Sequence, residues 1–80
     1  MTAHEFQRTW NDHIPEFPVP IEQIDLWLAL HTEAVVLKGI TATFSKWNRD
    51  KHKMNEDYLI RYASKSMNNE TSRTAAKVIR

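Results

Sequence analysis

Positively charged side chains are the residues of this chain whose types and spacing could do chemistry. The 80 residues include 11 lysines and arginines, and nine of these follow residue 45, with four acidic residues among them. Residues 1–45 carry two basic and six acidic residues, so the charge is −4 there and +5 in residues 46–80. Lysine and arginine supply most of the non-specific affinity for phosphates. The division therefore predicts an acidic partner for the second half, with DNA as the first candidate.

The candidate nucleic-acid-binding residues follow from this division. They are Lys46, Arg49, Lys51, Lys53, Arg61, Lys65, Arg73 and Lys77. Asparagines interspersed among them could donate to phosphates or read bases. A solvated basic helix face that binds nothing has the same composition, and the sequence leaves both interpretations open.

Other kinds of site find little support in the residues. The chain has no cysteine, which excludes a thiolate metal site and a cysteine nucleophile. Its four histidines are spread along the chain without a pair at i, i+4. With one glycine, it has no glycine-rich loop to cradle a nucleotide phosphate. We therefore predict a protein that is not an enzyme and that uses no cofactor and no metal.

The hydrophobic pattern also argues against a membrane protein. The longest apolar run is far shorter than a membrane span, and the N-terminus lacks the basic-then-apolar form of a signal peptide. We expect a soluble, cytoplasmic protein.

Residues 32–47 are the stretch around which the predicted fold is organised. Its apolar side chains recur at i, i+4, i+7, i+8 and i+11, which predicts one buried helical stripe: Val36, Ile40, Thr43, Phe44 and Trp47. Thr32 and Glu33 suit a helix start. Gly39 lies in the middle, where glycine costs about 1 kcal/mol relative to alanine. We interpret it as a close approach by another backbone, either a neighbouring helix or a ligand phosphate.

Two shorter helices are predicted before this stretch. Residues 3–14 form the first, and three prolines then impose an extended connector up to Pro20. Residues 20–30 form the second, which is apolar on two sides because Leu26 and Leu30 point away from the main face. Either neighbouring helices sandwich it, or a partner protein covers Leu26 and Leu30. The second possibility includes self-association into a homo-oligomer.

The second half of the chain is predicted to add a basic helix. Residues 48–53 form a polar loop, and Asn55 has the chemistry of an N-cap. The helix that follows places Arg61 and Lys65 on its outer side. Asn68 and Asn69 are expected to end it, and Thr71 to cap a last short basic segment.

These patterns predict an all-α protein, a compact bundle of four to five short helices, because no segment alternates like a strand. Residues 1–80 make a single domain. Residues 1–19 are its N-terminal helix and proline-rich connector, residues 20–68 its core helices and residues 69–80 a basic C-terminal segment.

Three stretches resemble one known family. They are residues 20–28 (PIEQIDLWL), 33–40 (EAVVLKGI) and 54–61 (MNEDYLIR), and together they are similar to the C-terminal domain of DnaD-like primosome and phage replisome-organiser proteins. The resemblance covers residues 5–76. The chain departs from the family after Arg61, where the family has an isoleucine–leucine pair and a tryptophan, and at Gly39, where the family has alanine.

The resemblance implies an all-helical domain that binds single- or double-stranded DNA and contacts a replicative helicase. DNA would be contacted by the last helix and its tail, through Arg61, Lys65, Arg73 and Lys77. The implied function is a DNA replication accessory of phage or mobile-element type. The alternative is a protein-interaction or inhibitor module that uses Leu26 and Leu30.

Overall fold

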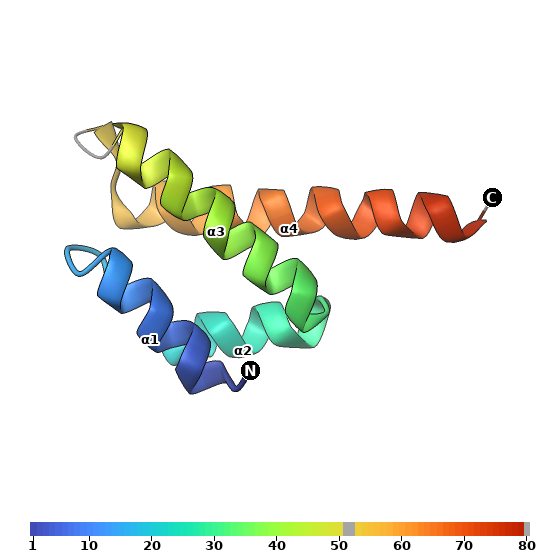
Figure 1. The fold of residues 1–80 in the computed structure, drawn as a ribbon, viewed down its shortest axis with the longest axis horizontal. Helices are drawn as coiled ribbons and strands as arrows, with labels where there is room; N and C mark the ends of the chain where they lie inside the picture. The colour runs from blue at the N-terminus through green and yellow to red at the C-terminus, as the bar shows by residue number, and fades with distance from the viewer. Residues whose placement is uncertain (51–52, 80) are drawn as a thin grey trace.

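A computed structural model describes the backbone of residues 1–50 and 53–79, and the side chains of residues 1–50 and 53–73. Within these residues the chain forms four helices and no strand: α1 (Ala3–His13), α2 (Ile21–Leu30), α3 (Glu33–Asp50) and α4 (Glu56–Ile79), drawn in Figure 1. The radius of gyration is 12.6 Å. A compact chain of this length has a radius of about 12 Å. The predicted compact all-α fold is therefore confirmed.

Helices α1 and α2 pack through their tryptophans and hold the connector between them. The rings of Trp10 and Trp27 lie 5.9 Å apart. Trp10 Nε1 donates a hydrogen bond of 2.9 Å to the carbonyl of Phe17. The backbone N–H of Val19 donates one of 2.9 Å to Asn11 Oδ1. The prolines leave the connector without regular backbone hydrogen bonds. These two bonds from side chains of α1 satisfy backbone groups of the connector and hold it against α1.

Helix α3 packs against the first half of α4, and the two cross in Figure 1. Four of the five residues of the predicted α3 stripe are buried, together with Gly39, whereas Phe44 is half-buried. One face of α4 is buried as well, and the buried residues are Val36, Gly39, Ile40, Thr43 and Trp47 on α3 and Leu59, Ala63 and Met67 on α4. A Cβ atom on Gly39 would lie 2.5 Å from Met67 Cγ and 3.2 Å from the carbonyl oxygen of Ala63. The close approach predicted from Gly39 is thus made by a neighbouring helix.

Helix α4 is one continuous helix, so the predicted break at Asn68 and Asn69 is wrong. Both asparagines are exposed and helical. Asparagine in a helix costs well under 1 kcal/mol, which ion pairing and packing easily exceed. Glu70, the next residue, forms an ion pair of 3.0 Å with Lys38 of α3. The end of α4 extends past the other helices in Figure 1.

The loop predicted for residues 48–53 also begins later than expected, because α3 continues to Asp50. Lys46 and Asp50 form an ion pair of 2.9 Å at i, i+4, which supports the last turn. Pro20, predicted as the first helical residue of α2, is instead its N-cap.

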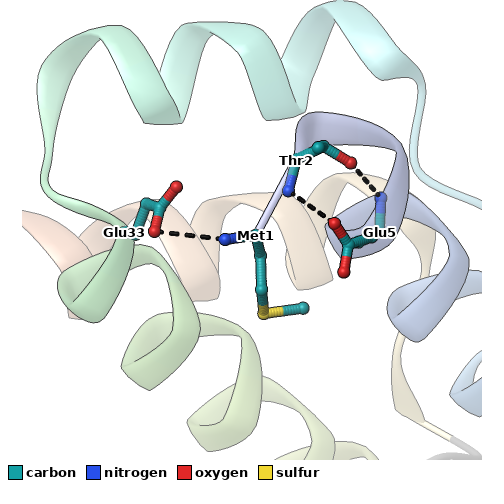
Figure 2. A network of polar contacts seen from close by, with 4 residues as sticks. All are labelled: Met1, Thr2, Glu5 and Glu33. Atoms are coloured by element: carbon teal, nitrogen blue, oxygen red, sulfur yellow. Dashed lines mark hydrogen bonds and ion pairs between the residues drawn. The ribbon is translucent and has the colours of Figure 1, made fainter.

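The N-terminus of α1 is closed by a capping box, drawn in Figure 2. The N–H of Glu5 donates to Thr2 Oγ1 at 3.2 Å, and the N–H of Thr2 donates to Glu5 Oε1 at 3.0 Å. The terminal amine of Met1 forms an ion pair of 3.2 Å with Glu33 in the first turn of α3. These contacts join the start of α1 to the start of α3.

Replacing Gly39 tests the closeness of α3 and α4. G39A gains about 1 kcal/mol of helix propensity. It also forces the side chain of Met67 and the α4 backbone to move, so we expect a net loss of about 1–3 kcal/mol in the free energy of unfolding. The double variant G39A/M67A removes the methionine atoms that clash. In denaturant titrations its loss should be smaller than the sum of the two single losses, and simple additivity would contradict the contact.

The capping box makes stability depend on pH in a defined direction. Its hydrogen bonds from the backbone and hydroxyl of Thr2 lower the pKa of Glu5 from its ordinary value of 4.5. A carboxyl with a lowered pKa in the folded chain stabilises the fold fully above the unfolded pKa, and this effect disappears as pH falls through the folded pKa.

E5Q keeps an acceptor without a charge, so wild type should be the more stable at pH 7 and should lose that advantage below pH 4.5. Thermal unfolding of both proteins from pH 7 to acid checks this. A difference that stays constant with pH would contradict it. The companion variant T2A should lose about 1 kcal/mol of stability at neutral pH.

Candidate nucleic-acid interface

A hollow lies along the outer face of α4. Its lining residues are Asn55, Tyr58, Arg61, Tyr62, Lys65, Ser66 and Asn69, and none of them is acidic. The rings of Tyr58 and Tyr62 stack with their centroids 6.5 Å apart and their planes at 13°. Arg61 and Lys65 are both exposed beside these rings.

The helical period of α4 explains why these side chains share a face. Leu59, Ala63 and Met67 are fully buried toward the core. At about 3.6 residues per turn, Tyr58, Arg61 and Lys65 then point away from the core. The helix start is fixed by Asn55, whose Oδ1 accepts a hydrogen bond of 2.9 Å from the N–H of Tyr58. The predicted N-cap is confirmed, as is the exposure of Arg61 and Lys65.

A second, smaller depression adjoins the hollow at the end of α3. Lys46, Asp50, Lys53, Met54 and Tyr58 line it, so Tyr58 belongs to both concavities. Tyr58 is 45% exposed and lines both of them. We call the joint area the basic–tyrosine surface, made of Lys46, Lys53, Tyr58, Arg61, Tyr62 and Lys65.

Asp50, the acidic residue among the described residues that line the two concavities, reduces the positive charge of this surface. Asp50 forms its ion pair with Lys46, and this hydrogen bond and charge raise the pKa of Lys46 and lower the pKa of Asp50. Arg49 and Lys53 also lie near enough to lower the pKa of Asp50. Among the described residues, five basic side chains have no carboxylate oxygen within 4.0 Å of their nitrogens: Arg8 on α1, and Arg49, Lys53, Arg61 and Lys65 in the second half of the chain. Positive charge therefore remains after pairing.

The other candidates for phosphate binding lie elsewhere. Arg73 stands beyond the hollow, where its guanidinium lies 3.7 Å from Glu70. Glu70 also pairs with Lys38, so this part of α4 carries charges of both signs. Lys51 and the side chain of Lys77 lie outside the described residues.

The leucines predicted for partner binding are exposed, Leu26 by 52% and Leu30 by 60%. The structure places only one of them in a groove. Leu30 lines a groove where the end of α2 meets α3 and α4, whereas Leu26 does not. We call this the leucine groove, lined by Ala29, Leu30, His31, Thr32, Ala34, Val35, Leu37, Lys38, Thr41, Glu70 and Thr71.

Sequence reasoning missed three residues of these two surfaces. Leu37 is 42% exposed in the groove, and its position off the buried stripe of α3 was the available signal. In the sequence, Tyr62 falls on the same helix face as Leu59 and Ala63, and Tyr58 enters only through the family resemblance, so neither was predicted to line the hollow. Their spacing at i, i+4 was the signal for adjacent rings, while their exposure depended on how α4 packs.

Comparison of the chain with protein-family models, with curated protein sequences and with solved structures found no match. The resemblance to DnaD-like proteins stays a prediction. In the part of the chain that the structure describes, no helix is long and apolar enough to cross a membrane. Within the same residues, no three histidine or carboxylate side chains gather as a metal site would require.

Proposed function

We propose that this chain is a small nucleic-acid-binding module that contacts phosphates through the basic–tyrosine surface. The observation that carries the proposal is the hollow on α4, where Arg61 and Lys65 flank two tyrosines and no acidic side chain contributes to the lining. A carboxylate in the lining would repel a polyanion. The described lining of the hollow on α4 has none, and Asp50 in the adjoining depression is paired with Lys46.

The geometry supports contacts of two kinds. Arg61 and Lys65 lie one turn apart on α4, and each offers donors for a phosphate. Tyr58 presents an exposed ring beside them, and aromatic rings accept bases by stacking without sequence preference. Asn55 and Asn69 at the two ends of the hollow add neutral donors. Together these groups fit a nucleic-acid backbone with accessible bases.

The DnaD-like resemblance narrows the proposal. It suggests that the bound nucleic acid is DNA, that the module assists DNA replication and that a replicative helicase is its protein partner. The matching stretch 54–61 includes Tyr58 and Arg61, which both line the hollow. This narrower role rests on the resemblance, whereas phosphate binding rests on the geometry.

A second candidate function, a protein-interaction module, is supported by the leucine groove. Leu30 and Leu37 stand exposed in the leucine groove, and exposed apolar patches of this kind mark protein contacts. An interaction module would use this groove and not the basic–tyrosine surface, so substitutions can separate the two functions.

The double variant R61Q/K65Q tests phosphate binding. Each charge-assisted contact contributes about 1.5 kcal/mol. We therefore expect the affinity for an oligonucleotide of arbitrary sequence to fall at least about tenfold at low salt. The slope of log affinity against log salt should fall by about one for each phosphate contact removed. Fluorescence anisotropy with single- and double-stranded DNA at several salt concentrations measures both quantities.

K38Q is the matched control, because it removes one positive charge from a lysine on α3 that pairs with Glu70 outside the basic–tyrosine surface. It should leave affinity and slope close to those of wild type. No binding of either DNA form by wild type at low salt would remove the proposal. K38Q removes one charge and R61Q/K65Q removes two, so a loss of log affinity in K38Q that is half that of R61Q/K65Q would show that net charge, and not this surface, governs binding.

A further inference from the structure

The leucine groove combines exposed leucines with a hollow on one side of the chain. It holds a hollow of about 920 Å³. Leu30 and Leu37 stand at its walls with 60% and 42% of their surface exposed. Protruding leucines and the hollow that could receive them therefore lie on the same face. This is the arrangement that a two-fold contact requires, because in such a contact one patch meets its own copy.

The charge of the groove favours a second copy as its occupant. Its described lining includes one cation, Lys38, and one carboxylate, Glu70, whose charged atoms lie 3.0 Å apart. The described lining residues carry no net charge, and Arg73 lies beside them with its guanidinium 3.7 Å from Glu70. A lining without net charge does not repel its own copy across a two-fold axis. Lys38 is on α3 and Glu70 is on α4, so two facing grooves can bring the lysine of each copy toward the carboxylate of the other.

The basic–tyrosine surface is unsuited to a two-fold contact, because Arg61 and Lys65 would face the same positive charges of the second copy. It also lies on another side of α4. Arg61 and Glu70 are separated by about two and a half turns at about 3.6 residues per turn, so they point in opposite directions. A contact through the groove would leave the basic–tyrosine surface of both copies open.

The molecule is large enough for such a contact. A stable dimer buries roughly 800 Å² on each partner, which is about 15% of the 5398 Å² surface of this chain. The groove involves the end of α2, the first half of α3 and α4 around Glu70, and these elements flank one another. We propose that the chain self-associates through the leucine groove into a two-fold dimer.

L37E tests this proposal by placing like charges across the two-fold axis. Leu37 is exposed, so the substitution should not disturb the core. S45E is the matched control, because it places the same charge at an exposed position of α3 outside the groove. Sedimentation velocity over a range of concentrations should show wild type and S45E rising from 9.4 kDa toward twice that mass. The dissociation constant of L37E should be at least about tenfold higher.

A wild-type protein that remains at 9.4 kDa up to about 1 mM would overturn the proposal and leave the groove to another protein. Equal weakening of the dimer by S45E and L37E would also overturn it, since the contact would then lie elsewhere. R61Q/K65Q should dimerise like wild type. Circular dichroism of each variant confirms that it is folded.

Discussion

The contact between α3 and α4 at Gly39 is the constraint on which the other features depend. Without a side chain at Gly39, Met67 and the carbonyl of Ala63 sit directly against α3. This contact fixes the rotation of α4 about its axis. Once Ala63 and Met67 face inward, the helical period turns Tyr58, Arg61 and Lys65 outward and aims Glu70 toward Lys38. A single missing side chain thus decides which residues of α4 can meet a ligand.

The chain keeps its two surfaces apart by composition as well as by rotation. Two of the three tryptophans and six of the ten acidic residues lie in the first half, where Trp10 and Trp27 build the core and the carboxylates are exposed or cap helices. The second half supplies the cations. The ion pair of Lys38 with Glu70 joins the two halves, and the ion pair of Lys46 with Asp50 lies within the second half. Unpaired positive charge is left on α4, at Arg61 and Lys65.

The helices could be predicted because their signals are local. Stripes at helical spacing, the Asn55 cap and the lone Gly39 each follow from residues within a few turns. The end of α4 was misplaced because Asn68 and Asn69 carry a weak local preference, while Lys38 on another helix supports the turn that follows them. Tertiary packing also decided the surfaces. The place of Tyr58 between the two concavities depends on the end of α3. The place of Leu37 in the groove depends on where α2 ends. The spacing of residues in the sequence predicts neither.

Binding to the outer face of α4 is the central claim, and amide chemical shifts measured during titration with a short single-stranded oligonucleotide test it most directly. The shifts should change at residues 53–69 on the outer side of α4 and at the end of α3, and they should reverse with added salt. Amides around Leu30 and Leu37 should stay unchanged at constant protein concentration. Changes concentrated at those leucines, or no changes at low salt, would contradict the claim.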